Sequence, residues 1–248
     1  MQKGLEIEMF GYEPEFVDCG DARIACYDVG RGKTLVLLHG NGEDSSYWTA
    51  QIPEFTRFYR VLAVDSRGHG ASDSGSAGLS FDQMAKDLKT VLDVRGIKKA
   101  HFLGFSDGGN LVIKFALAYP EYVDKLILNG ANVEMFSGLK PHIQLPIYAQ
   151  YGVAAAMSRF SKKAARRRAV LGLMVHPYGV TMHDLERLTM PTLIIVGEHD
   201  MIRDKQTKEM ASHIPHCQVE VFRDGDHYVA AKQPSRFNRT VIEFLLGR

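Results

Sequence analysis

The sequence predicts an α/β fold built on one mostly parallel β-sheet that is covered by helices on both faces. Short runs such as residues 34–38 and 192–196 are apolar at nearly every position, as strands buried on both faces require. Between these runs, apolar residues recur at helical spacing, most clearly over residues 81–92. Strands that alternate with helices favour a parallel sheet, because each return crossing needs a helix.

The elements can be assigned in order along the chain. Two short β-rich runs near the start predict an antiparallel entry hairpin, and six further apolar runs complete an eight-stranded sheet. The clearest helix start is at Ser80, where Gln83 three residues later gives the spacing of a capping box. The last helix begins near Pro234, a residue tolerated in a first turn. The expected strands are residues 16–18, 23–27, 34–38, 60–64, 100–104, 125–128, 192–196 and 217–222.

Residues 132–187 interrupt this alternation, since they contain no clean strand and place aromatic residues and methionines among helix formers. We interpret the segment as a helical lid inserted into a core made of residues 1–131 and 188–248. The apolar residues could instead form only a helical core, and both interpretations hold together if the lid also roofs a pocket. Met135 and Tyr148 are therefore candidate pocket residues.

The overall charge gives no sign of a charged partner. The chain has 248 residues with 30 basic and 29 acidic side chains, and its formal net charge is +1. We therefore expect neither nucleic acid nor a membrane surface as a partner, and no apolar run approaches the roughly 20 residues that span a bilayer. The basic run at residues 162–168 is interpreted as the solvated face of a helix.

Cysteine usage and the chain start favour a cytoplasmic protein. The three cysteines are odd in number and form no C-x-x-C pair, which is typical of a reducing compartment. The first ten residues include Glu6 and Glu8 and lack the apolar stretch of a secretory signal. We expect a monomer or weak homodimer that acts on a small-molecule substrate.

Residues 104–108, Gly-Phe-Ser-Asp-Gly, match the pattern G-x-S-x-G. The pattern alone would occur by chance in roughly one such chain in ten, so its context decides. Here it begins where an apolar strand ends and is followed by a helical stretch over residues 110–118. This is the strand–turn–helix setting of a nucleophile elbow, which predicts Ser106 as the nucleophile.

A serine nucleophile needs a base to take its proton and an acid to orient that base. His227 follows the last predicted strand and is the candidate base. Asp200 follows the strand at residues 192–196 and is the candidate acid, with Asp204 and Asp226 as competitors. Both positions lie after strand ends at the edge of the sheet where open α/β folds bind ligands.

An oxyanion hole needs two backbone donors near the nucleophile. The N–H of Asp107, directly after Ser106, is the first candidate. The second is the N–H of Asn41 in the loop His39-Gly40-Asn41-Gly42 that follows an apolar strand, with Gly42 as the alternative. Phe105 and Tyr228 flank two of the candidate catalytic residues, so we expect them to contact substrate.

These motifs together resemble the α/β-hydrolase superfamily over nearly the whole chain. The resemblance rests on residues 39–42, on the D-x-R-G-x-G-x-S turn at residues 65–72, on the elbow and on the segments around Asp200 and His227. It implies an eight-stranded, mostly parallel sheet with a small helical lid. Within the superfamily, residues 104–109 and 130–132 resemble the valacyclovirase (biphenyl-hydrolase-like) branch. That branch implies a substrate-binding role for Asp107 toward an amino group, whereas the competing interpretation is an exposed aspartate at a helix start.

The expected function is that of a serine hydrolase which cleaves a small carboxylic ester through an acyl-serine intermediate. The same residues could cleave amides such as prolyl or aminoacyl bonds, or the C–C bonds of diketones, and a ligand-binding protein on the same scaffold is a further alternative. No cofactor is expected, because the sequence lacks a dinucleotide fingerprint and a Walker loop. No metal is expected either, since no two histidines have the spacing of metal ligands.

Overall fold

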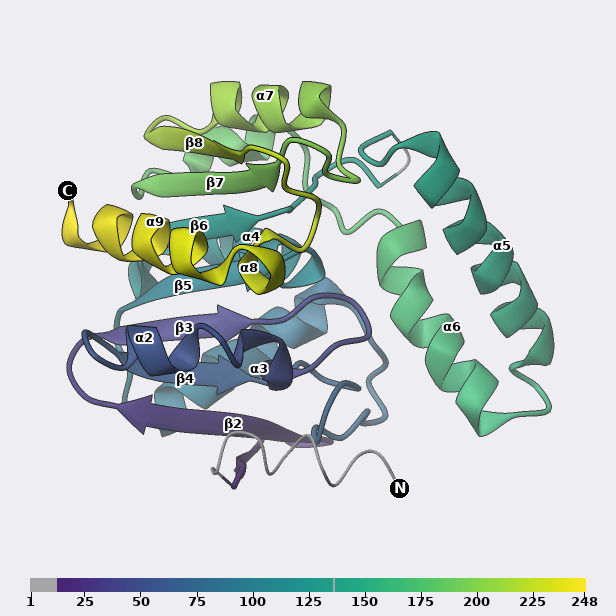
Figure 1. The fold of residues 1–248 in the computed structure, drawn as a ribbon. Helices are drawn as coiled ribbons and strands as arrows, with labels where there is room; N and C mark the ends of the chain where they lie inside the picture. Colours follow the sequence, from purple (N-terminus) through teal and green to yellow (C-terminus); the bar gives the residue numbers. More distant parts are fainter. Residues whose placement is uncertain (1–12, 136) are drawn as a thin grey trace.

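The computed structural model of the chain describes residues 13–135 and 137–248. The prediction that no secretory signal is present concerns residues 1–10 and lies outside this part. The described chain forms one eight-stranded sheet in the order β1-β2-β4-β3-β5-β6-β7-β8, with helices on both faces (Figure 1). β1 pairs with β2 and β2 with β4 in antiparallel fashion, while all later pairings are parallel. The predicted fold class is confirmed.

Each of the eight expected strands is present, with ends that differ by a few residues at most. β3 is buried at all five positions and β7 at all six, as the unbroken apolar runs predict. The strands are β1 (Glu15–Asp18), β2 (Arg23–Gly30), β3 (Thr34–Leu38), β4 (Arg60–Val64), β5 (Ala100–Phe105), β6 (Val123–Asn129), β7 (Thr192–Gly197) and β8 (Cys217–Phe222).

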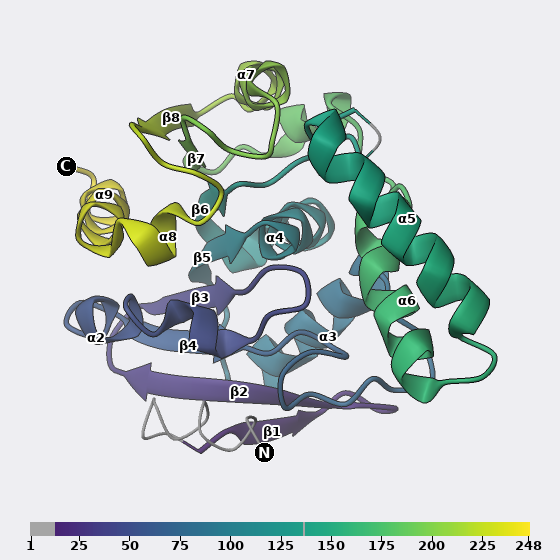
Figure 2. The ribbon, with the colours of Figure 1, turned by 45° about the vertical axis from the view of Figure 1, so that its right-hand side comes forward.

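The helices divide the hydrophobic core into two layers, one on each face of the sheet. α3 and α4 bury their apolar sides in one layer, and α2 and α9 bury theirs in the other, as Figure 2 shows. The helices are α2 (Ile52–Phe55), α3 (Phe81–Val94), α4 (Asp107–Ala118), α5 (Pro141–Met157), α6 (Lys162–Val175), α7 (Asp204–His213), α8 (Val229–Lys232) and α9 (Pro234–Leu246), with short 3-10 turns η1 (Ser45–Trp48), η2 (Pro120–Tyr122) and η3 (His183–Arg187).

The capping box expected at the start of α3 is only half formed. The hydroxyl of Ser80 accepts the N–H of Gln83 at 3.2 Å. The amide of Gln83 does not return to the backbone of Ser80 but donates to Oδ1 of Asp87 at 3.0 Å. This contact orients the Gln83 side chain along the helix toward Asp87, away from the Ser80 N–H that would donate to it in a full capping box.

That buried cluster centres on Arg67, in the turn at residues 65–72. Its guanidinium is fully buried and lies 2.7 Å from Asp87 on α3 and 2.9 Å from Asp21 in the turn between β1 and β2. In the same turn, Asp65 accepts the N–H groups of Ser45 and Ala71. This turn therefore joins the entry hairpin, the sheet and α3.

α5 and α6 form a helical hairpin that projects from one side of the sheet (Figures 1 and 2). Both ends of the segment are built into the main core through buried side chains such as Met135, Leu139 and Leu173. α5 itself buries only Ala154 among its side chains. Two polar contacts join α6 to the core, from Asn41 to the carbonyl of Val170 and from Arg166 to the carbonyl of Gly68.

No helix in the described part of the chain is both long enough and apolar enough to cross a membrane.

Candidate active site

Ser106 lies at the sharp turn between β5 and α4. Its backbone φ of 51° and ψ of −118° are strained for a residue with a side chain, and such strain gathers at functional sites. The flanking glycines make the turn possible. A Cβ on Gly104 would lie 2.3 Å from the carbonyl oxygen of Gly108, and a Cβ on Gly108 would lie 2.3 Å from that of Leu38. The expected elbow geometry is therefore present.

The turn places Ser106 at the N-cap of α4, with its side chain partly exposed while the residues on both sides are buried. The positive end of the helix dipole and the unpaired N–H groups of the first turn point toward this position. A negative charge that develops next to Ser106 is favoured there.

Asp200 and His227 are in direct contact. Nδ1 of His227 lies 2.7 Å from Oδ1 of Asp200, and both side chains are buried. The carboxylate also accepts the N–H groups of Ile202 and Gly197. Asp226 instead pairs with Lys232 and accepts the N–H of Tyr228, and Asp204 begins α7. Of the three aspartates that the sequence allowed, Asp200 is the one bonded to the histidine.

Aromatic rings and a glycine hold the imidazole of His227 in place. A Cβ on Gly130 would lie 2.6 Å from Cε1 of His227, so only glycine leaves room for the ring. The ring of Phe105 lies 4.9 Å from that of His227, and its neighbour Tyr47 is stacked on Phe105 at 4.3 Å. The ring of Tyr228 meets the imidazole edge-on at 5.6 Å.

The backbone N–H groups of Asn41, Gly42 and Asp107 donate no hydrogen bond within residues 13–135 and 137–248. All three are thus free to bind an oxyanion, and the choice between Asn41 and Gly42 stays open. The loop that carries the first two is tied to the elbow, because Nδ2 of Asn41 donates to Oδ2 of Asp107 at 2.7 Å.

The carboxyl of Asp107 is buried and only 5% exposed. The interpretation of Asp107 as a solvent-exposed helix-start residue is therefore wrong. Asn41, from the loop at residues 39–42, covers this carboxyl, a non-local contact that the helix position alone does not predict. Burial raises the pKa of Asp107 to about 6, although the hydrogen bond from Asn41 opposes the shift.

Known proteins share both the sequence pattern and the fold. The family model described as alpha/beta hydrolase fold matches residues 33–169. The chain belongs to this family.

Its relatives in the family include enzymes with different named substrates. A 2-hydroxy-6-oxononadienedioate/2-hydroxy-6-oxononatrienedioate hydrolase of Paraburkholderia phymatum is 31% identical over 91% of each chain. Carboxylesterase YbfK of Bacillus subtilis is 27% identical over 98% of this chain and 89% of its own. The crystal structure of that carboxylesterase superposes with a TM-score of 0.80 at 24% identity, covering 99% of this chain and 96% of the other. These α/β-hydrolase relatives support an enzyme, and specifically a hydrolase.

Two asparagines and a tyrosine, Asn110, Asn132 and Tyr178, form a polar cluster behind Asp107. Asn110 lies one turn along α4, and its amide is 3.4 Å from Oδ1 of Asp107 and 3.3 Å from Oδ1 of Asn132. The hydroxyl of Tyr178 donates to the carbonyl oxygen of Asn132. The sequence analysis did not single out Asn110, although its position four residues after Ser106 puts it on the same side of the helix.

Glu43 is a second carboxyl group near Ser106, and no sequence motif pointed to it. Its Oε2 accepts the N–H of Gly40 at 3.2 Å, in the loop that carries Asn41. Burial raises the pKa of Glu43 to about 7, and interaction with His227 partly offsets the shift. The available signal was an acidic residue within a glycine-rich loop that follows a buried strand.

The other candidate substrate residues are distributed unevenly. Tyr228 is exposed beside His227, whereas Phe105 is buried under it. Met135 is buried, and its sulfur is 3.5 Å from the amide of Asn132. Tyr148 lies on α5, where it is partly exposed. Phe105 and Tyr228 thus contact His227. Met135 contacts the cluster of Asn110 and Asn132, and Tyr148 lies on the α5–α6 hairpin.

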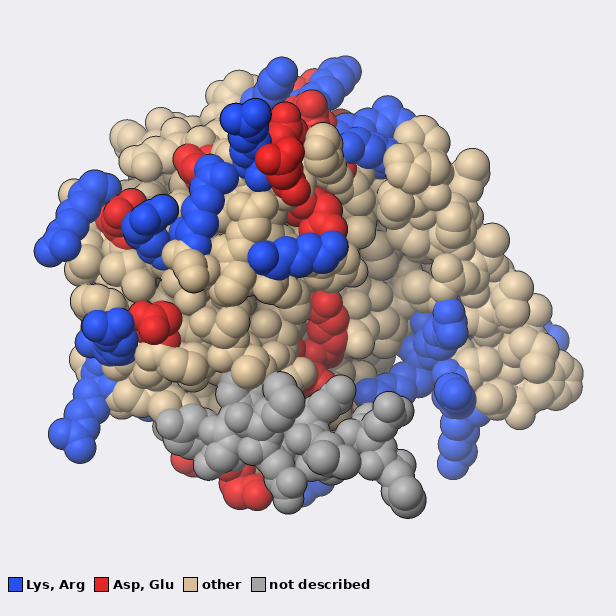
Figure 3. All heavy atoms as spheres, in the orientation of Figure 1, with Lys and Arg blue, Asp and Glu red and all other residues tan. Residues whose placement is uncertain are grey.

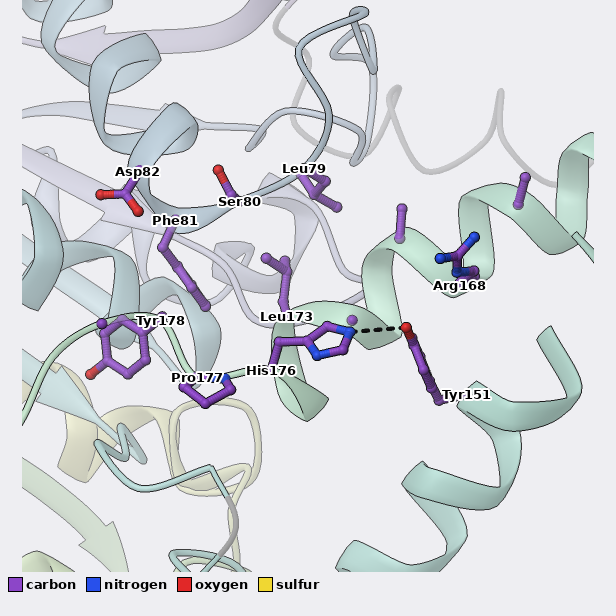
Figure 4. A pocket seen from close by; sticks show the side chains of 14 residues that line it. Leu79, Ser80, Phe81, Asp82, Tyr151, Arg168, Leu173, His176, Pro177 and Tyr178 are labelled. Carbon is purple, nitrogen blue, oxygen red and sulfur yellow. Dashed lines mark hydrogen bonds between the residues drawn. The ribbon is translucent and has the colours of Figure 1, made fainter. Parts of the chain in front are cut away.

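A cleft of about 620 Å³ lies between α6 and the start of α3, where Leu79, Arg168, His176 and Tyr178 are among the lining residues (Figure 4). None of Ser106, Asp200 or His227 lines it. Tyr178 forms part of its wall and also contacts the asparagine cluster, so the cleft lies behind the site rather than at the nucleophile.

Glu198, His199 and Asp224 could together offer ligand atoms to a metal ion, since these atoms lie within 4.8 Å of one another. All three side chains are exposed, and Glu198 already accepts the N–H of Asp224. Exposed acidic groups of this kind are common on surfaces and do not indicate a metal site.

Proposed function

We propose that this α/β-hydrolase cleaves a small carboxylic ester through an acyl-serine intermediate, with Ser106 as nucleophile, His227 as general base and Asp200 as the orienting acid. The observation that carries the proposal is the buried 2.7 Å contact between Asp200 and His227, on the same sheet edge as the strained elbow of Ser106.

In the proposed mechanism, Asp200 keeps the proton of the imidazole on Nδ1, so that Nε2 is free to accept the proton of the Ser106 hydroxyl. The serine oxygen attacks the ester carbonyl, and the backbone N–H groups of Asp107 and of Asn41 or Gly42 stabilise the oxyanion. His227 then protonates the departing alcohol. A water molecule, deprotonated by His227, releases the acid and restores the serine.

A second candidate reaction is the hydrolysis of a C–C bond in a ring-opened diketone. The observation that favours it is the 31% identity to a hydrolase whose name gives 2-hydroxy-6-oxononadienedioate as its substrate. Carboxylesterase YbfK, which covers more of this chain, favours the ester instead. Hydrolysis of a p-nitrophenyl ester panel and of a 2-hydroxy-6-oxo-dienoate by the same preparation separates the two, because the enzyme should turn over its own class far faster.

Labelling with a fluorophosphonate tests the nucleophile directly. The wild-type chain should react at Ser106, and Ser106→Ala should neither react nor hydrolyse any ester, since loss of a triad member costs several orders of magnitude in rate. Alanine removes one hydroxyl from a partly exposed position, so the Tm should stay nearly unchanged. A labelled or active Ser106→Ala would reject the assignment, and an unlabelled wild type would favour a ligand-binding protein.

A further inference from the structure

The α5–α6 hairpin has a charge very different from that of the whole chain. Residues 135–183 contain seven of the 30 Lys and Arg side chains and none of the 29 Asp and Glu. This segment therefore carries a local charge of +7 within a chain whose total is +1. The net charge of the whole chain, on which the expectation of no membrane partner was based, does not reveal this local excess of positive charge.

One face of α5 is apolar and open to solvent. We call it the outer face. Its residues follow helical spacing and are all exposed, and none of them is Lys, Arg, Asp or Glu. Leu145 and Val153 on this face are 68% and 66% exposed. In Figure 3 the hairpin's outer surface is largely tan, and blue side chains gather at its lower end. The outer face consists of His142, Leu145, Pro146, Ala149, Gly152, Val153, Ala156, Met157 and Phe160.

The apolar and basic features meet where α5 turns into α6. Phe160 is 84% exposed there and adds an aromatic side chain to the exposed apolar patch of the outer face. Arg159, Lys162 and Lys163 surround it in sequence and are also exposed. Within residues 13–135 and 137–248, no carboxylate lies within ion-pair distance of any of these three cations. We call residues 157–163 the hairpin tip.

We propose that the hairpin tip and the outer face dock onto an anionic lipid surface. Phe160 and the outer face would enter the boundary between headgroups and acyl chains, while Arg159, Lys162 and Lys163 pair with lipid phosphates. Apolar side chains that enter the acyl boundary and basic side chains that meet anionic headgroups each contribute to the binding of a protein to a membrane surface.

Other occupants fit these observations less well. A second copy of the chain would bring two segments of charge +7 together, and the two would repel each other. A nucleic acid would pair with the cations but would gain nothing from an apolar face, since its affinity comes mainly from phosphate contacts. An anionic lipid surface uses both features.

Co-sedimentation of the purified full chain with vesicles tests the proposal without reference to hydrolysis. Vesicles of phosphatidylcholine and phosphatidylglycerol in equal parts should bind the chain, and vesicles of phosphatidylcholine alone should bind it far less. A basic side chain near an anionic surface contributes about fivefold to affinity. Lys162→Gln together with Lys163→Gln should therefore weaken binding about 25-fold. Phe160→Ser should weaken it by about tenfold or more.

The matched control is Lys98→Gln with Lys99→Gln, an exposed lysine pair before the amino end of β5, far from the hairpin. It makes the same charge change and should leave vesicle binding unchanged. Circular dichroism and fluorophosphonate labelling report whether each variant is folded.

Binding that is equal on the two vesicle types, absent from both, or lost equally in the control would overturn the proposal. A DNA duplex that binds in place of vesicles would assign the tip to nucleic acid. A dimer that Phe160→Ser dissociates would assign it to a second copy.

Discussion

Two carboxyl groups lie near the candidate nucleophile, the buried Asp107 and the half-buried Glu43, and both have raised pKa values. Burial raises the pKa of Asp107 to about 6 and that of Glu43 to about 7. Asn41, in the loop at residues 39–42, donates a hydrogen bond to Asp107. In the same loop, the N–H of Gly40 donates to Glu43. The charge of the site therefore changes between pH 5 and pH 8 through these two carboxyl groups.

If Asp107 attracts a substrate ammonium group, that preference should depend on pH. The carboxyl is charged above its pKa of about 6 and neutral below it, so the preference should fall as the pH drops from about 7 to about 5. The measurement is kcat/KM for an aminoacyl ester divided by that for its des-amino isostere. The proposed catalytic residues would act on both substrates alike, so their contribution cancels in the ratio.

We expect the ratio to be about ten- to a hundredfold at neutral pH, the worth of a charge-assisted contact. Asp107→Asn keeps the shape and should make the ratio small and independent of pH. The same ratio in both proteins would show that Asp107 does not select the substrate.

Glu43 should make the fold less stable at high pH. Its pKa is raised from 4.5 to about 7 in the folded state. Between these two pH values, the folded chain therefore holds a proton that the unfolded chain has released. Stability from this group is therefore complete below about pH 4.5 and falls as the pH rises to about 7. Glu43→Gln cannot ionise and can still accept the N–H of Gly40. It should raise the free energy of unfolding by on the order of 2 kcal/mol at pH 8.

Urea unfolding of the two proteins at pH 5 and pH 8 checks this effect. The gain from Glu43→Gln should be several times larger at pH 8. An equal gain at both values would mean that the carboxyl is not held neutral.

At the scale of elements, the elbow depends on how closely β5 and α4 approach. Gly104→Ala would place a methyl group 2.3 Å from the carbonyl oxygen of Gly108, so the turn must shift. Because backbone atoms cannot move aside as a flexible side chain can, we expect a loss of several kcal/mol in stability, as for other strained substitutions. Thermal unfolding and fluorophosphonate labelling should both show the damage.

Gly152→Ala on α5 is the matched control, because nothing lies within 4 Å of its added Cβ. Alanine favours an exposed helix position by about 0.5–1 kcal/mol over glycine. The control should therefore keep full labelling and gain slight stability. Wild-type behaviour in Gly104→Ala would show that β5 and α4 do not need this close approach.

At the scale of the whole molecule, Arg67 joins parts of the chain that are distant in sequence. It is fully buried between Asp87 and Asp21. Asp87→Asn would leave this buried cation with one charged partner fewer, and breaking such a pair costs about 3–5 kcal/mol. For a chain of this length the Tm should fall by roughly 10 °C, whereas fluorophosphonate labelling at low temperature should persist, because the cluster is separate from Ser106.

The control for this prediction is Glu54→Gln, which breaks the exposed pair between Arg57 and Glu54. Solvent screens that pair, so its loss should cost well under about 1 kcal/mol. Similar costs for Asp87→Asn and Glu54→Gln would mean that the buried cluster adds no special stability.

The sequence by itself determined the eight strands, the alternation that makes most of the sheet parallel, and the elbow at Ser106. These features depend on local patterns, since a short apolar run bounded by turn residues is typical of a strand buried on both faces, and the tight turn needs glycine at residues 104 and 108. The positions of Asp200 and His227 followed from the same strand ends.

Only the tertiary structure decided which aspartate contacts His227, that Asp107 is buried and Glu43 half-buried, and that the cations around Phe160 have no acidic partner in the described chain. The sequence favoured Asp200 but left Asp204 and Asp226 as competitors, and the contact of Asp200 with Nδ1 of His227 decided between them. Burial and pairing arise where segments far apart along the chain meet. Periodicity and spacing report on a residue's own element, and they carry no information on what another segment places against it.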